Sequence, residues 1–448
     1  MSSNTQVDAQ ASAPFEGPEK LLEIWFAPSA EEVPSLNNLD GKFGLRSVSR
    51  RIWEDVLQIV KCKILSVIEG AEMDAYLLRF FLSAVTLLIT HPLLFNSESS
   101  FFVSPHRLIL KTCGTTLNLL GLPRILEIAS NEAKLHSVYR LFYSRKSFMF
   151  PERQHGPHKD WKQEVEYLDQ FFKNGAAYTI GKVNGDHWLL YMATADDDDL
   201  ASSPQIESVN DRQIDYTIEI LMSDLSPKAS ERFFFSESVF QDDPSARGLD
   251  ISNELGITKI FPPSLINLDA FAFTPCGYSS NALIKWDHGS LVCDSDASVD
   301  DSPQNGQSSD IKNGDILTKP GHSGEGYYTI HVTPEQGWSY ASFECNIPLS
   351  SSAKSPHEGK IPDLKSLIKR VVNIFEPSRI TLTLFISSED NDVGVEGESP
   401  IEAAQRAFKA ALTSCGADSE IHGIYKRTDK INYEFGSYDL AFASFELK

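Results

Sequence analysis

The sequence predicts a mixed α+β fold in which β-strands outnumber helices. Several segments alternate apolar and polar residues with the two-residue period of a half-buried strand, and an Asn-Gly pair joins two of them. Two segments near the C-terminus instead show the apolar spacing of an amphipathic helix. Of the 448 residues, 41% are apolar, which is enough for a sizeable core in one large domain or in two or three smaller ones.

The clearest strand signal is a hairpin over residues 176–193. Its arms, 176–183 and 187–193, flank Asn184-Gly185, and Asn-Gly accepts the positive φ angles of a type I′ turn. Further strands are predicted over residues 107–112, 216–222, 327–333, 339–343 and 438–445. No internal repeat is evident in the sequence.

Two helices are predicted near the C-terminus. The second begins with Ser399 as N-cap, Pro400 at the first helical position and Glu402 completing a capping box, and it ends at Gly416. The first carries one apolar stripe, formed by Leu364, Leu367, Ile368, Val371 and Phe375.

The composition disfavours several classes of partner. The chain has 62 Asp and Glu against 40 Lys and Arg, a net charge of −22, and such a surface repels nucleic-acid phosphates. The six cysteines are scattered without a C-x-x-C pair, so neither a disulfide framework nor a metal site is expected. The first 14 residues lack the features of a secretory signal, and the apolar stretch 80–95 is too short to span a membrane. We therefore expect a soluble, cytoplasmic protein with no membrane, metal or nucleic-acid partner.

Three acidic or polar segments are interpreted as surface insertions. Residues 195–210 open with four aspartates, residues 294–326 are almost free of large apolar side chains, and residues 387–399 form a shorter acidic loop. Segments of this composition cannot bury enough apolar surface to offset the entropy of ordering, so 294–326 is predicted to be disordered.

Two predicted strands carry polar residues on one face. The two-residue period places Thr329 and His331 together, and it places Asp215, Thr217 and Glu219 together. A single histidine on a strand is more often structural than catalytic, and surface carboxylates usually meet only water. If the carboxylate face were buried, it would need cations nearby.

A series of longer motifs resembles one family. The chain is similar to the eukaryotic S-adenosylmethionine decarboxylases, pyruvoyl-dependent enzymes of polyamine synthesis. The similarity extends in order from Phe15 to Glu344 through FEGPEKLLEIWF, SESSFFV, LILKTCGTT, FYSRKSFM, NGAAYTIG, TIEILMSDL, FTPCGYSSN, YYTIHVTPE and SYASFE.

The resemblance implies a fold and a processing event. The family fold is a four-layer α/β/β/α sandwich of two antiparallel sheets with helices outside. The proenzyme cuts itself between Glu98 and Ser99, which would give a β chain of residues 1–98 and an α chain of residues 99–448 within one fold. The sequence leaves open whether two such αβ protomers pair as a dimer.

The family chemistry implies roles for three residues in that cleavage. The Ser99 hydroxyl would attack the preceding carbonyl to form an ester, with Ser279 assisting, and His331 would then remove the Ser99 α-proton. Elimination and hydrolysis would leave a pyruvoyl group at the new N-terminus and release ammonia. A neutral imidazole suits this role because its pKa lies near working pH.

The remaining family residues would serve the mature enzyme and its substrate, S-adenosylmethionine. The pyruvoyl ketone would condense with the substrate amino group and accept the electrons released as CO2 departs. The implied catalytic residues are the proton donor Cys113 and the acidic residues Glu16 and Glu19. The implied substrate contacts are Phe15 and Phe273 at the adenine, Glu335 at the ribose and the segment at Glu98.

Some family members are activated by putrescine, which a buried acidic cluster holds. The matching positions here are Glu23, Asp215, Thr217, Glu219 and Glu344. We expect putrescine activation of this chain, because an empty cluster of buried carboxylates is costly and a diamine would relieve that cost.

The chain departs from the family pattern just before the cleavage site. Residues 79–96 separate Ala75-Tyr76-Leu77-Leu78 from Ser97-Glu98-Ser99-Ser100, are strongly apolar, and are interpreted as interrupting one strand. We interpret them as a retained intron translated in frame, the alternative being a lineage-specific loop. Two alternative functions also remain open: an uncut, inactive paralogue that regulates a partner subunit, and a polyamine-binding protein without chemistry.

Overall fold

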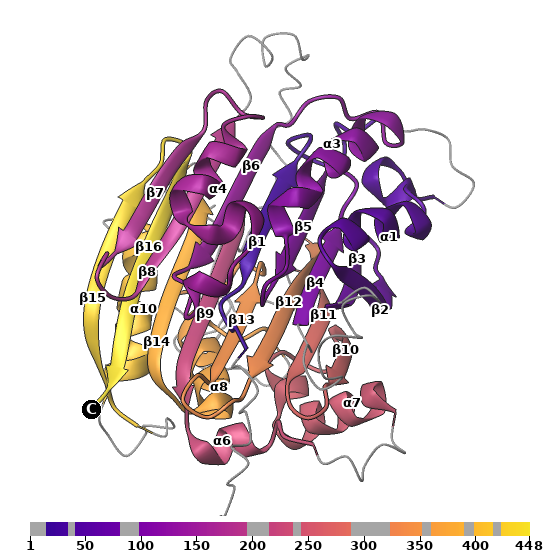
Figure 1. Ribbon diagram of the computed structural model, residues 1–448. Coiled ribbons are helices and arrows are strands. Elements are labelled where there is room, and N and C mark those ends of the chain that lie inside the picture. The colour runs from indigo at the N-terminus through magenta and orange to yellow at the C-terminus, as the bar shows by residue number, and fades with distance from the viewer. Residues whose placement is uncertain are drawn as a thin grey trace, which may run out of the picture.

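The computed structural model describes residues 15–34, 41–80, 98–194, 215–235, 243–287, 323–351, 360–388, 398–414 and 423–448. These residues form two eight-stranded antiparallel sheets, stacked as Figure 1 shows. Sheet A has the order β2-β3-β4-β5-β1-β6-β8-β7 and sheet B the order β10-β11-β12-β13-β9-β14-β16-β15. The predicted antiparallel α+β architecture is therefore confirmed.

The strand bounds are as follows. Sheet A consists of β1 (Lys20–Trp25), β2 (Cys62–Glu69), β3 (Asp74–Phe80), β4 (Glu98–Val103), β5 (Arg107–Thr112), β6 (Arg140–Lys146), β7 (Ala176–Gly181) and β8 (His187–Thr194). Sheet B consists of β9 (Tyr216–Leu225), β10 (Ile266–Ala272), β11 (Tyr278–Asp287), β12 (Ser323–Thr333), β13 (Tyr340–Cys345), β14 (Pro377–Ser387), β15 (Tyr425–Glu434) and β16 (Tyr438–Leu447).

Helices cover the outer face of each sheet. On sheet A, α1 (Arg50–Ile59), α3 (Leu122–Asn131) and α4 (Trp161–Leu168) share one apolar core with the outward-facing strand residues. On sheet B, α7 (Pro244–Glu254), α8 (Leu364–Phe375) and α10 (Pro400–Thr413) do the same. The short helix α6 (Pro227–Glu231) follows β9. Single 3-10 turns are η1 (Gly44–Ser47), η2 (Asn118–Gly121), η3 (Pro151–Arg153), η4 (Gly156–Lys159) and η6 (Ile257–Lys259).

The inner faces of the sheets pack against each other. Phe102 on β4 stacks on Tyr327 on β12 with ring centroids 4.1 Å apart, and two mixed apolar clusters join residues of both sheets. An ion pair also crosses the interface, because the Lys111 ammonium on β5 lies 2.6 Å from Glu344 on β13. With helices on both outer faces, these contacts complete the four-layer sandwich.

The two halves of the chain have the same topology, although no repeat is evident in the sequence. Each strand of sheet A has a counterpart eight strands later in the equivalent place of sheet B. By this rule β4 corresponds to β12, and these two strands face each other across the interface. The site described below forms where they meet.

Most local predictions are confirmed, and two need correction. The strands, the two helices, the helix start at Ser399 and the hairpin occur as predicted. The predicted helix end at Gly416 and the segments 195–210 and 294–326 lie wholly or largely outside the described residues. The hairpin turn is not type I′ at Asn184-Gly185. It spans residues 182–186, with Gly185 N donating to Lys182 O, and the positive φ of +100° falls on Gly181.

The second correction concerns residues 79–96. They do not interrupt one strand, because Ala75–Leu78 and Glu98–Ser100 belong to different strands, β3 and β4, which pair antiparallel with Leu78 opposite Ser99. Arg79 and Phe80 end β3, and the remaining residues connect the two strands. A connection between hairpin arms tolerates extra length better than the middle of a strand does.

Within the described part of the chain, no helix is long and apolar enough to cross a membrane.

Candidate active site

The two serines after Glu98 point to opposite faces of sheet A. Ser99 shares its face with Phe101 and Val103, which belong to the helix-side core, and its hydroxyl lies near the Cys62 thiol. Ser100 faces the other sheet. Both hydroxyls are fully buried, but only Ser100 has hydrogen-bond partners among the described residues.

Ser100 lies at the centre of a hydrogen-bond network between the sheets. Its Oγ is 2.7 Å from Asn281 Oδ1, 3.1 Å from Thr329 Oγ1 and 2.9 Å from His331 Nε2. Asn281 Nδ2 donates to the Tyr76 carbonyl, which fixes the orientation of the amide. Thr329 Oγ1 also lies 3.4 Å from His331 Nε2, so the hydroxyls of Ser100 and Thr329 both adjoin the imidazole lone pair.

His331 is positioned by a buried carboxylate. Its Nδ1 lies 3.2 Å from Glu19 Oε1, and Glu19 also accepts hydrogen bonds from the hydroxyls of Ser342 and Tyr340. Burial lowers the pKa of His331, with Glu19 opposing that shift. Burial raises the pKa of Glu19, but the charge of Lys111 and the His331 hydrogen bond outweigh it and bring the pKa to about 2. Near pH 7 the site therefore holds an ionised Glu19 and a neutral imidazole with Nδ1–H directed at it.

Ser279 lies beside this network. It pairs with His331 across β11 and β12, so both side chains project from the same face of sheet B. Its Oγ is fully buried and, like that of Ser99, has no hydrogen-bond partner within the described residues. A buried hydroxyl without a protein partner is available to a ligand, an ordered water or a reacting group.

Cys113 lies at the end of β5, close to a buried lysine. The Lys20 ammonium donates to Gly114 O at 2.8 Å and lies close enough to Cys113 for the two charges to interact. Burial lowers the pKa of Lys20 to about 8, against the opposing charges of Glu16 and Cys113. Glu16 itself accepts hydrogen bonds from two backbone amides, those of Met149 (2.7 Å) and Phe150 (2.8 Å). It is thus separate from the Glu19–His331 pair.

The predicted substrate contacts are brought together in part. Phe15 N donates to Glu335 Oε2 at 2.7 Å, so these two residues are neighbours despite 320 positions of separation. Phe273 is buried in the loop before β11, where its amide donates to the Gly277 carbonyl. The described residues contain no ring contact between Phe15 and Phe273, and the side chain of Glu98 lies outside the described part.

All five residues of the predicted acidic cluster line one small cavity between the sheets. Its volume is about 40 Å³, and its walls include Ser144, Trp188 and Phe385. The acidic lining residues are Glu23, Asp215, Glu219 and Glu344, together with the hydroxyl residue Thr217. The predicted strand alternation is confirmed, since Tyr216, Ile218 and Ile220 point into the helix-side core instead.

Lys111 supplies the cation that this buried acidic face requires. Its ammonium lies 2.6 Å from Glu344 and 3.7 Å from Glu219, and the charge of Glu19 acts on it as well. Burial nevertheless raises the pKa of Glu219 to about 7, against the opposing charge of Lys111. Burial also raises the pKa of Glu23 to about 7, opposed by Arg107. Arg107 also lies 3.4 Å from Glu23, and the charge of Arg140 acts on Asp215, so three cations face the four carboxyl groups of the cavity. The raised pKa values of Glu219 and Glu23 show that further positive charge beside these two groups would favour their ionised forms.

The comparisons with known proteins identify the family. Residues 12–446 match the family described as adenosylmethionine decarboxylase. The chain is 32% identical to the S-adenosylmethionine decarboxylase proenzyme of Xenopus laevis, over 98% of this chain and 97% of that protein. It is 34% identical to that of Drosophila melanogaster, over 96% and 95%, and 30% identical to that of Saccharomyces cerevisiae, over 97% and 93%. The chain belongs to the adenosylmethionine decarboxylase family.

Adenosylmethionine decarboxylases use a pyruvoyl group, and the residues present here fit one. The Ser279 hydroxyl is buried beside His331 without a hydrogen-bond partner among the described residues, whereas the Ser99 hydroxyl points to the other face of sheet A, near the Cys62 thiol. A group made from Ser99 would lie at the start of β4, next to the Ser100 network. Ser99 would supply the atoms of the group, and His331 and Ser279 would supply an imidazole and a second hydroxyl beside it.

Sequence reasoning missed several residues of this adenosylmethionine decarboxylase site. Lys111 could have been found from the sequence, because it is a charged residue within the otherwise apolar strand LILKT. Lys20 could have been found because it lies within the family motif FEGPEKLLEIW. Ser100 and Asn281 carry no such signal, because serine and asparagine are common polar residues. Their roles depend on which strands face each other across the sheets, and local periodicity does not contain that information.

Proposed function

We propose that this protein is a self-processing S-adenosylmethionine decarboxylase that is cut between Glu98 and Ser99. The observation that carries the proposal is the neutral imidazole of His331, held by Glu19 and in contact with Ser100, the residue next to Ser99. A base in that position, beside a fully buried serine with an orphaned hydroxyl, is what removal of the Ser99 α-proton requires.

Cleavage begins, in this proposal, with attack of Ser99 Oγ on the Glu98 carbonyl carbon, which converts the amide to an ester. The orphaned hydroxyl of Ser279 is available to donate a hydrogen bond to the oxyanion that forms. His331 then takes the Ser99 α-proton while Glu19 stabilises the resulting imidazolium. The Glu98 carboxylate leaves by β-elimination, and hydrolysis of the product releases ammonia.

The mature enzyme then decarboxylates S-adenosylmethionine. The pyruvoyl group supplies an electron sink for the departing carboxylate. Cys113 returns a proton to the substrate α-carbon, and the nearby Lys20 ammonium favours the thiolate that remains. Phe15, Phe273 and Glu335 bind the nucleoside, with Glu335 placed by its bond to the Phe15 amide.

The acidic cavity is proposed to bind putrescine as an activator. Two ammonium groups would stabilise the ionised forms of Glu219 and Glu23, whose pKa values burial raises. Lys111 would carry the effect to Glu19, because the charges of Lys111 and Glu19 interact. The remaining proposals are a cytoplasmic location and an αβ protomer that is able to pair as a dimer.

Intact-mass spectrometry of the purified protein tests the proposal. We expect two chains that end and begin at Glu98 and Ser99, the larger lighter by one ammonia than simple hydrolysis predicts. We also expect release of labelled CO2 from carboxyl-labelled S-adenosylmethionine, lost in Cys113→Ala. A single uncut chain without CO2 release would refute the proposal and favour the regulatory paralogue, whereas an uncut chain that still binds putrescine would favour the polyamine-binding protein.

A further inference from the structure

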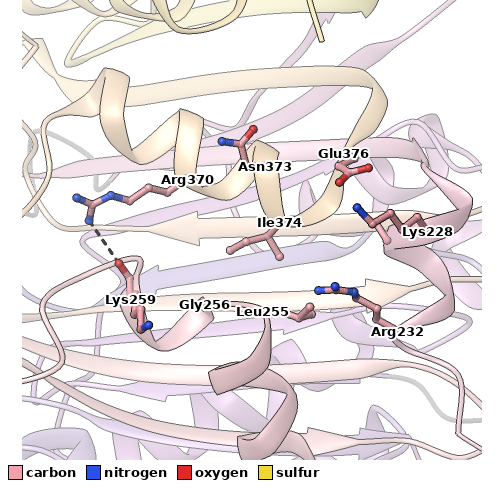
Figure 2. A pocket seen from close by; sticks show the side chains of 10 residues that line it. Lys228, Arg232, Leu255, Gly256, Lys259, Arg370, Asn373, Ile374 and Glu376 are labelled. Carbon is pink, nitrogen blue, oxygen red and sulfur yellow. Dashed lines mark hydrogen bonds between the residues drawn. The ribbon is translucent and has the colours of Figure 1, made fainter. Parts of the chain in front are cut away.

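A basic pocket lies on the helical side of sheet B, away from the site described above. Its volume is about 410 Å³, within the range of small-molecule sites. Figure 2 shows its cations arriving from three elements: Lys228 and Arg232 from α6 and its end, Lys259 from η6, and Arg370 from α8.

Most of this positive charge is uncompensated. Arg370 donates to the backbone carbonyls of Lys259 and Ile260, but the side chains of Lys228, Arg232 and Lys259 have no hydrogen-bond or ion-pair partner among the described residues. Glu376 is the one carboxylate of the described lining, and it accepts a hydrogen bond from Ser226.

This cluster of cations is unusual in a chain whose net charge is strongly negative. With a net charge of −22, the protein has carboxylates available to pair with most of its cations. Four cations that converge on one concave surface, three of them without partners, repel each other, and a bound anion would relieve that repulsion. The floor of the pocket includes the apolar side chains of Leu255 and Ile374, so its contacts are not purely ionic.

We propose that this pocket binds a compact polyanion of the polyphosphate or phosphate-ester class. The cations surround the cavity from three sides, which suits a ligand with several anionic oxygens better than a single carboxylate. Arginine forks and lysine ammonium groups are the side chains that most commonly bind phosphate.

The pocket is connected by backbone hydrogen bonds to the loop before β11. Arg232 is followed by Phe233, whose carbonyl accepts from Gly277 N, and by Phe235, whose amide donates to Pro275 O. The same loop carries Phe273 and leads to Ser279. We therefore expect polyanion binding at Arg232 to stabilise the hydrogen bonds of this loop. Any resulting change in the KM for S-adenosylmethionine rests on the proposed function.

The test uses the purified full chain and sodium tripolyphosphate, with sodium sulfate at equal ionic strength as the control for screening. Isothermal titration calorimetry is expected to give saturable 1:1 binding. The double variant R232Q/K259Q is expected to bind at least about tenfold more weakly, because two charge-assisted contacts are lost. The matched variant K365Q/K369Q, which removes two cations of α8 outside the pocket lining, is expected to bind as the natural chain does.

Hydrogen exchange with and without tripolyphosphate provides a readout that needs no catalytic activity. Protection is expected in residues 232–235 and 273–279 of the natural chain and not in R232Q/K259Q. Binding that sulfate reproduces, or that both double variants lose equally, would overturn the site. Saturable binding without protection of 273–279 would overturn the connection to the loop.

Discussion

Putrescine binding is predicted to depend steeply on pH because of Glu23 and Glu219. Burial raises the pKa of each to about 7, so near pH 6 both carry protons and near pH 8 both are ionised. A diamine dication binds the ionised cavity, and protons must leave before it enters. The stability of the ligand-free protein depends on pH in the opposite direction to putrescine binding. The raised pKa values favour the protonated folded state, so the free energy of unfolding falls as pH rises from about 4.5 to about 7.

The magnitude follows from the two pKa values. At pH 6 a carboxyl group with a pKa of about 7 is ionised in about one molecule in ten, and at pH 8 in about nine. Each group therefore weakens putrescine binding by about tenfold between pH 8 and pH 6, and both together by up to about a hundredfold. Glu19, with a pKa of about 2, contributes nothing in this range.

Calorimetry at pH 6, 7 and 8, in two buffers of different ionisation enthalpy, measures both the Kd and the protons released. The variant Glu219→Gln is expected to bind putrescine more weakly at pH 8. Its Kd should change about tenfold less between pH 8 and pH 6 than that of the natural chain, since one titrating group is gone. The exposed Glu127→Gln on α3 serves as the control and should leave both quantities unchanged. An equal Kd at pH 6 and pH 8 without proton release would refute the reasoning.

Three other predictions test the cleavage site, a buried ion pair and the connection between β3 and β4. Ser99→Ala is expected to remain one chain. Ser100→Ala is expected to be cut about tenfold more slowly than the natural chain, because His331 loses one hydrogen bond. Gel analysis of the chains over time measures the cleavage rate, and equal rates for Ser100→Ala and the natural chain would contradict a role for the hydrogen-bond network. Glu164→Gln on α4 is expected to lower the free energy of unfolding by about 3–5 kcal/mol, because it leaves Arg145 buried without its counter-ion; urea unfolding against the exposed Glu166→Gln measures it. Deletion of residues 81–96, which keeps Arg79 and Phe80 of β3, is expected to keep both the fold and the cleavage, because it shortens a connection between hairpin arms. An insoluble or uncut product would show that the segment is needed.

Local sequence patterns predicted the strands and helices well because burial on one side is a local property. The alternation over β9 and β12 separated the helix-side residues from the inter-sheet residues correctly, as Ile218 and Ile330 in the outer core demonstrate. The capping signal at Ser399 also marked a helix start, where its side chain accepts from Glu402 N. In each case the deciding interaction lies within a few residues of the signal.

The failed predictions concern features that depend on how neighbouring strands pair and in which register. The Asn184-Gly185 pair is compatible with a type I′ turn, but the register that pairs Gly181 with His187 leaves five residues in the connection, and Gly181 takes the positive φ. Residues 79–96 were misplaced for the same reason, because a continuous motif in the sequence does not reveal that its two ends lie in different strands.

The site itself requires both halves of the chain. Ser99 and Ser100 lie on β4, whereas Thr329 and His331 lie on β12, the equivalent strand of the second half. Because the topology repeats while the sequence does not, equivalent strands came to carry different chemistry: serines to be modified on one and the base on the other. A strand from either half alone would expose these polar groups to water, where the imidazole pKa would return toward its ordinary value. The face-to-face packing of the sheets therefore lowers the His331 pKa further and brings the imidazole against β4, which is why neither motif alone predicts the reaction.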